Sequence, residues 1–345
     1  MANRGRARAG VAQASSVDSG NEQSRALELY RVMRTIRALE TVIEKMHHEG
    51  RMIGSFHSSV GQEAAAAGVC LGLRRTDLVT STHRGHGHAV AKDVPLVGIF
   101  AELLGRLGGV SGGRGGSMHL HHRESGFLGE NAIVGGGLPL AAGAAWARRR
   151  QGTDDIAVAF TGDGAASQGV FHETLRLARH WSSPCLFVVE NNRLAHSMPS
   201  EDMFGEPGSI ASMVDAMGIP ARFVDGRDVF DVHRVAMELI AEVRQGRPAF
   251  LECLVFRVRP HSLSDPDYRY RAKDSGAQWL ESNDPLLRLR AVRGDLVAEF
   301  DAIDAEIAVV VETARQEAEA MVATPPAAAT EHIYSTPGLG PDGPA

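Results

Sequence analysis

The sequence predicts an α/β fold, a doubly wound parallel sheet flanked by helices, with helical extensions at both ends. The first observation behind this prediction is that short apolar runs alternate with amphipathic helical patterns between residues 139 and 256. Strands that alternate with helices pair in parallel through right-handed crossovers. The second is that apolar residues repeat at helical spacing near both ends of the chain. At 345 residues, about three quarters of the unfolded surface can be buried on folding.

The first part of the chain is predicted to hold one long helix followed by loops. Apolar residues recur three and four positions apart between Leu27 and Met46, which predicts a helix over 22–48. Residues 1–20 carry three Arg among Ser and Ala but no repeating apolar face, so we expect a disordered tail there rather than a transit peptide. The segment 50–137 is rich in Gly and His and predicts mostly loops, with short helices at 62–71 and 96–107.

The second part of the chain is predicted to alternate between helices and strands. Helices are expected at 139–150, 169–180, 209–217 and 229–244, and strands at 156–160, 185–189, 222–224 and 249–256.

An Arg-rich loop over 257–273 follows, and helices near 285–300 and 302–322 close a single domain that spans 21–322. The remainder, 323–345, is expected to be a loose tail with only a short element at Ile333 and Tyr334.

Composition excludes several classes of protein. With 42 Asp and Glu against 36 Lys and Arg, the net charge of -6 argues against a basic nucleic-acid binder. Cys70, Cys185 and Cys253 form no C-x-x-C pair, which excludes a disulfide framework and a cysteine zinc site and favours a reducing cytoplasm. The longest apolar stretch, 64–73, is about half of the roughly 20 residues that a membrane span needs.

The segment from Thr161 to Asn192 carries the strongest chemical signal. Asp163 follows one apolar strand and Asn192 follows the next, so both lie at the same edge of a parallel sheet. Carboxylate and amide oxygens suit Mg²⁺, and the helix after Gly164 can offer backbone N–H groups to a diphosphate. Gly-Asp-Gly alone is a common turn, but 26 residues separate Gly164 from Asn191-Asn192, which makes a complete βαβ unit with polar groups at both ends.

This segment resembles the thiamine-diphosphate motif, Gly-Asp-Gly followed by about 25 to 30 residues and Asn-Asn. Over residues 25–295, the chain resembles the alpha subunit of the two-subunit E1 components of the 2-oxoacid and acetoin dehydrogenases. Further motifs of that family occur in the same order: Gly61-Gln62-Glu63, Ser81 to His88, Gly115 to His119, Ala132 to Gly135 and His261 to Pro266. The resemblance implies a thiamine-diphosphate-binding fold and an oxidoreductase acting on an aldehyde or oxo group.

The resemblance also implies site residues. It assigns cofactor contacts to His57, His83, Arg84, Ala132, Val134, Asp163, Gly164, Ala165, Asn192, Leu194 and His261. Among these, it assigns Mg²⁺ to Asp163, Asn192 and the Leu194 carbonyl, and catalytic roles to His261 and His57. Read without the resemblance, a His-Arg pair in a loop such as His83-Arg84 is more often solvated surface, although an Arg fork suits phosphate oxygens. The many histidines between 83 and 122 lack the fixed spacing of a transition-metal site.

The chain departs from the family pattern at several positions. Ala132 stands where the family usually has Gly, and the contact there uses the backbone, so it requires a negative φ. Ser55 replaces the Phe of a Gly-Phe-x-His pattern before His57, which predicts a different substrate pocket. Leu194 replaces a Tyr whose carbonyl oxygen binds the metal, a change that leaves the backbone ligand in place. His261 is the single histidine left of a His-Gly-His context.

Half of the active site is expected to come from a partner. We identify no carboxylate here that activates the cofactor's aminopyrimidine ring, and the resemblance assigns that Glu to a beta subunit. It therefore predicts an α2β2 heterotetramer with the cofactor at the subunit interface and a lipoyl-bearing E2 acyltransferase as acceptor. Pyruvate, acetoin and other 2-oxoacids all stay open as substrates.

Two alternatives are weighed against this function. A nucleotide-binding Rossmann enzyme would need G-x-G-x-x-G after the strand that ends at Phe160. A non-catalytic or diverged thiamine-binding subunit would be expected to lose Asp163 or Asn192, and both are present.

Overall fold

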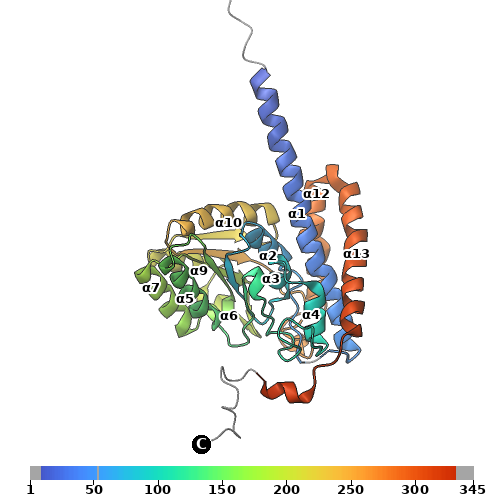
Figure 1. Ribbon diagram of the computed structural model, residues 1–345. Helices are drawn as coiled ribbons and strands as arrows, with labels where there is room; N and C mark the ends of the chain where they lie inside the picture. The colour runs from blue at the N-terminus through green and yellow to red at the C-terminus, as the bar shows by residue number, and fades with distance from the viewer. Residues whose placement is uncertain (1–8, 53, 332–345) are drawn as a thin grey trace, which may run out of the picture.

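A six-stranded sheet, parallel at every pairing, runs through the computed structural model, which describes residues 9–52 and 54–331 (Figure 1). Its order is β2-β1-β3-β4-β8-β7. The strands are β1 (Leu78–Thr80), β2 (Phe127–Gly129), β3 (Ala157–Gly162), β4 (Cys185–Asn191), β7 (Ala221–Asp225) and β8 (Ala249–Leu254). The predicted α/β class with a parallel sheet is confirmed.

Both faces of the sheet are buried, which explains why its central strands are apolar without alternation. Successive residues of β3 and β4 belong to different cores: Val158 and Leu186 lie in one, and Ala159 and Phe187 in the other. Ala159 pairs in register with Phe187, and Val158 with Leu186, so each core receives matched side chains from neighbouring strands. Polar residues predicted for the site, such as Asp163 and Asn192, therefore follow the ends of the strands.

Helices cover each face of the sheet (Figure 1). On one face lie α5 (Gly137–Arg150), α7 (Gly169–Trp181) and α9 (Ser209–Ala216), whose buried residues belong to one core. On the other lie α2 (Glu63–Cys70) and α10 (Val229–Arg244). The start of α10 is fixed by Asp228, whose side chain accepts hydrogen bonds from the N–H groups of Phe230 and Asp231.

A second helical layer packs outside the α10 face. It consists of α1 (Ala9–His48), α4 (Leu96–Leu103), α12 (Pro285–Val292) and α13 (Val297–Ala320). Tyr30 of α1 packs on Phe300 of α13 with ring centroids 4.2 Å apart, and its hydroxyl donates to Asp304 at 2.9 Å. The predicted helix boundary near 301 is wrong. The break falls at Gly294–Leu296, a 3-10 turn, because glycine is unfavourable inside a helix.

Two segments near the ends of the described part of the chain are more structured than expected. The backbone of α1 is helical from Ala9, so the prediction of a disordered tail over 1–20 is wrong for the described part of that range. At the other end, Thr324 donates its N–H to the Gly105 carbonyl at 2.9 Å, and a 3-10 turn follows at Pro326–Thr330. The composition of 323–345 does not predict that this segment pairs with the loop at Gly105. The element expected at 333–334 lies outside the described residues.

Several short elements were not predicted. Besides β1 and β2, they are α3 (His86–Ala91), β5 (Leu194–Ala195), β6 (Met198–Pro199), α8 (Glu201–Phe204), α11 (Ser275–Asn283) and the 3-10 turns Arg123–Ser125 and Asp267–Arg269. The helix expected just after Gly164 is the short α6 (Asp163–Ala166), which ends before α7 begins. Strands of two or three residues are too short to show a period. No helix in the described part of the chain is long and apolar enough to cross a membrane.

Candidate active site

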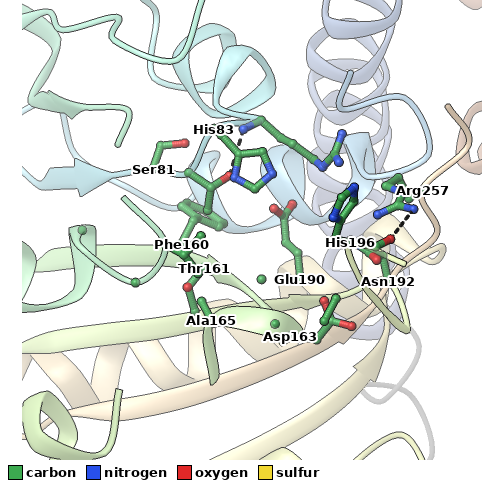
Figure 2. Close-up of a pocket in the computed structure, with 18 of the residues that line it drawn as sticks. Ser81, His83, Phe160, Thr161, Asp163, Ala165, Glu190, Asn192, His196 and Arg257 are labelled. Atoms are coloured by element: carbon green, nitrogen blue, oxygen red, sulfur yellow. Dashed lines mark hydrogen bonds between the residues drawn. The ribbon is translucent and has the colours of Figure 1, made fainter. Parts of the chain in front are cut away.

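A cavity of about 370 Å³ lies at the carboxyl edge of the sheet (Figure 2). Its walls are the carboxyl ends of strands and the segments that follow β1, β2, β3, β4 and β8, together with Gln62 at the start of α2. They bring together residues that are far apart in sequence, from Gln62 to His261. Convergence of strand ends at this edge is the usual position of a ligand site in a parallel α/β sheet.

Most of the predicted site residues line this cavity. They are His83, Arg84, Val134, Asp163, Gly164, Ala165, Asn192, Leu194 and His261. These residues come from five separate segments, so the sheet topology rather than sequence proximity gathers them.

The two other predicted residues do not line the cavity. His57 is buried behind its wall, with its ring centroid 4.9 Å from that of His83 and 5.1 Å from that of His261. Ala132 is exposed beside the lining residues Ile133 and Val134, and its φ is not positive, so alanine causes no strain there. His57 is therefore placed to support the other imidazoles, and a backbone contact from Ala132 would lie at the rim.

Asp163, Asn192 and Leu194 all line the cavity. Asp163 is 2% exposed, and its Oδ2 atom has no hydrogen-bond partner among the described residues. Burial raises the pKa of this carboxyl, and contacts with Ser200 and nearby backbone N–H groups oppose the rise. Asn192 Oδ1 accepts the Leu194 N–H at 3.1 Å. A carboxylate oxygen without a partner in the described ranges and an amide oxygen in the same cavity are hard donors of the kind that suits Mg²⁺.

Arg84 brings a buried positive charge, without an ion-pair partner in the described part of the chain, to the same cavity. Its side chain is 5% exposed and donates to the carbonyls of Ser58 and His261, at 2.9 and 2.8 Å, with no carboxylate partner among the described residues. Burial, together with nearby Arg257, lowers the pKa of Arg84 to about 9. A bound anion would supply the missing countercharge.

Three imidazoles beside Arg84 are held neutral. Burial, and then the charge of Arg84, lowers the pKa of His57 to about 4, of His83 to about 2 and of His261 to about 3. The Nε2 atom of His83 is buried without a hydrogen-bond partner among the described residues. Neutral rings of this kind can accept or donate one hydrogen bond each, and an anion in the cavity would favour their protonation.

The cavity also contains residues that the sequence did not single out for it: Gln62, Glu190, His196 and Arg257. Figure 2 shows Glu190 and His196 around the same space as His83 and Asp163. Gln62 lies in the Gly-Gln-Glu motif and Arg257 in the Arg-rich loop, but neither residue was assigned to the site. Glu190 precedes Asn191-Asn192 directly. No local signal marked His196, which depends on an unpredicted hairpin.

No group of three or more His, Cys, Asp or Glu is placed to hold a metal in the described ranges. The histidines between 83 and 122 are divided by their own contacts: His86 Nδ1 lies 3.2 Å from buried Glu40, and His88 Nδ1 lies 2.7 Å from the Ser81 hydroxyl. A transition-metal cluster is therefore not supported.

A model of the family described as the dehydrogenase E1 component matches residues 30–327. The chain belongs to this family. The predicted resemblance is confirmed, and the nucleotide-binding Rossmann alternative is excluded. Family membership implies thiamine diphosphate as cofactor and makes this E1 chain an alpha-type subunit of an oxidoreductase.

Several curated relatives resemble this E1 alpha chain along most of their length. The alpha subunit of acetoin:2,6-dichlorophenolindophenol oxidoreductase from Cupriavidus necator is 41% identical over 85% of this chain and 89% of its own. The protein of the same name from Bacillus subtilis is 39% identical over 81% and 83%. The pyruvate dehydrogenase E1 component subunit alpha of Rhizobium meliloti is 38% identical over 77% and 76%.

Proposed function

We propose that this E1 alpha chain provides the diphosphate and metal half of a thiamine-diphosphate-dependent dehydrogenase. One observation carries the proposal. Arg84 is a buried cation without a carboxylate partner among the described residues, and it lines the same cavity as Asp163, whose buried Oδ2 atom has no hydrogen-bond partner among them. A magnesium diphosphate satisfies both at once, because its phosphate oxygens pair with the cation and its metal with the carboxylate.

The residues on each side fit that complex. Asp163 and Asn192 would hold Mg²⁺ with side-chain oxygens and Leu194 with its carbonyl, while the N–H groups of Gly164 and Ala165 would face the diphosphate. His83 and Arg84 would bind its other oxygens. Bound thiamine diphosphate supplies a nucleophilic carbon and an electron sink for carbonyl chemistry.

The protein's own contribution is positioning and charge. Arg84 fixes the anionic end of the ligand and, through its bonds to the carbonyls of Ser58 and His261, holds the surrounding loops. His261 would hold or transfer a proton above that end of the cavity. Gln62, whose Nε2 atom is buried without a partner among the described residues, is a further donor that faces the ligand.

A beta subunit would complete the site. Ile133 and Val134 line the cavity, yet these residues are 74% and 52% exposed. Large apolar side chains at the mouth of an active site suit burial by another protein. An α2β2 heterotetramer with a lipoyl-bearing E2 as acceptor agrees with the alpha-subunit names of the relatives. We place the complex in the cytoplasm.

The substrate is acetoin or a 2-oxoacid such as pyruvate. Relatives of both names share similar identity with this chain, 41% and 39% for acetoin proteins and 38% for a pyruvate protein. The cofactor-side residues do not separate the two reactions. A non-catalytic subunit is disfavoured because Asp163 and Asn192 both lie in the cavity.

The test is to co-express the chain with a beta subunit and titrate the complex with thiamine diphosphate and Mg²⁺ by calorimetry. Asp163→Ala is expected to weaken cofactor binding at least a hundredfold, since it removes a charged metal ligand. Asp215→Ala, an exposed carboxylate on α9, is the matched control and should bind as the wild type does. Equal affinities for the two variants would refute the metal assignment.

A further inference from the structure

His196 lies at the tip of the β5–β6 hairpin, directly against His261. The two-residue turn His196-Ser197 connects the strands, and His196 has a φ of 57°. Its ring centroid is 4.3 Å from that of His261, closer than the rings of His57 and His83, at 5.1 and 5.4 Å. Two-residue hairpin turns need a positive φ at a central position, and His adopts it more often than most residues other than glycine.

Two further contacts connect the hairpin tip with the loop that carries His261. The Nε2 atom of His196 lies 3.8 Å from Asp265 Oδ1. The other oxygen of Asp265 accepts the His261 N–H at 3.1 Å and the Tyr270 hydroxyl. The His196 carbonyl accepts a hydrogen bond from Arg257, which is 1% exposed, at 2.8 Å. The backbone of His196 is thus held by a hydrogen bond, and its ring packs against His261 with Asp265 nearby.

These contacts confine the His261 ring from two sides. Its Nδ1 atom lies 3.3 Å from Nη2 of Arg84, and the ring of His196 covers another part of its surface. Within the described residues, Nε2 of His261 has no hydrogen-bond partner, so it is the ring nitrogen left for a ligand. Rotation of the ring would exchange the positions of Nδ1 and Nε2, so that Nε2 would no longer face the ligand.

We propose that His196 is a positioning residue for His261: its ring, presented by the β5–β6 hairpin, prevents His261 from rotating away from the ligand. This rests on the proposed function, in which His261 lies over the cofactor phosphates. The role requires a flat ring and a fixed hairpin, so a phenyl ring can replace the imidazole. The side chain of His196 is 61% exposed, so its removal is not expected to unfold the protein.

The test is a double-mutant cycle in the assembled alpha/beta complex, with thiamine diphosphate and Mg²⁺ binding measured by calorimetry. His196→Ala should weaken cofactor binding roughly tenfold and His261→Ala more, and the double variant should bind within about twofold of His261→Ala, because residues acting through one group are not additive. His196→Phe should restore most of the loss. In turnover, His196→Ala should lower kcat with little change in the KM of the substrate.

Met198→Ala is the matched control, since it shortens an exposed side chain of the same hairpin, 45% exposed, and should leave binding unchanged. Additive losses, or equal losses for His196→Phe and His196→Ala, would overturn the proposal.

A second measurement does not depend on the cofactor. In the full chain with ¹³C-labelled histidine, His196→Ala should shift the ring resonance of His261, assigned with His261→Ala, and Met198→Ala should not. An unchanged His261 resonance also overturns the proposal. Failure of the wild-type complex to bind the cofactor, with the resonance shift present, would instead count against the proposed function alone.

Discussion

Arg84 and the three imidazoles beside it show how the site is prepared for an anion. The guanidinium is buried with only carbonyl and imidazole partners, and the rings of His57, His83 and His261 stay neutral because protonation would add charge to a buried cationic site. When an anion binds there, charge-assisted hydrogen bonds replace the water around the anion and around the cationic site. The same charges make the ligand-free protein sensitive to acid.

The pKa values determine in which direction the free energy of unfolding changes with pH. In the folded chain, His83 titrates at about 2, but in the unfolded chain near 6.5. Below about pH 6.5 the unfolded state therefore binds more protons, and the free energy of unfolding falls as the pH falls. Each such histidine contributes a slope of up to about 1.4 kcal/mol per pH unit.

His83→Gln is expected to flatten this dependence. Urea unfolding of the full chain at pH 7, 6 and 5 should give a shallower fall in free energy of unfolding for the variant than for the wild type. His180→Gln, an exposed histidine on α7, should keep the wild-type slope. Indistinguishable slopes for wild type and His83→Gln would contradict a depressed pKa.

At the residue scale, the sequence predicted those side chains that follow a recognisable strand. Asp163 and Asn192 could be placed because an apolar run ends just before each of them. His196 and Arg257 could not, since their approach to the cavity depends on a two-residue turn and on packing against Tyr270. His57 lies next to His83, another predicted site residue, but behind the cavity wall.

Among the elements, α1, α2 and α12 are joined by one buried ionic network. Arg37 of α1 donates to Glu63 of α2 at 2.5 Å and to Asp284, the N-cap of α12, at 2.8 Å. Glu63 is fully buried, and its other oxygen accepts the N–H of Gly61. The two carboxylates raise the pKa of Arg37 against the effect of burial. This network fixes the Gly-Gln-Glu motif that leads into the cavity.

Arg37→Met should lower the free energy of unfolding by about 3 to 5 kcal/mol, because it leaves the Glu63 charge buried without its partner. Arg31→Met removes an exposed pair with Glu306, whose side chains are 44% and 53% exposed, and should cost less than about 1 kcal/mol. Urea denaturation followed by circular dichroism measures both. Similar small losses for the two variants would show that the buried network contributes little.

The sequence predicted the long elements because they bury a periodic face. α10 was placed correctly from Val229 to Arg244, and α7 to within one residue. The short strands β1 and β2 have too few residues to show a period, and they are recognised only through pairing, as between Val79 and Phe127. The break between α12 and α13 was misplaced because apolar residues continue across Gly294.

For the whole molecule, the exposed rim at Ile133 predicts how the subunits meet. Ile133→Asp puts a charge where a partner would exclude water, and should weaken assembly with the beta subunit without lowering the melting temperature of the isolated chain. Sedimentation velocity of the co-expressed subunits measures assembly. Val309→Asp, on a 66% exposed position of α13, is the control and should assemble normally. Normal assembly of Ile133→Asp would place the interface elsewhere.

The packing of α1 against α13 also has a consequence for folding during synthesis. The first helix pairs with one near the end of the chain, and β8 inserts between β4 and β7, so the core closes only after most of the protein has been made. At about 5 to 20 residues per second, the part of α1 that packs on α13 stays uncovered for tens of seconds, although α2 and α3 can cover another part earlier. Contacts of such large sequence separation also form slowly. A nascent chain of this kind is a natural client for chaperones, and a message truncated before α13 would yield a product prone to aggregation.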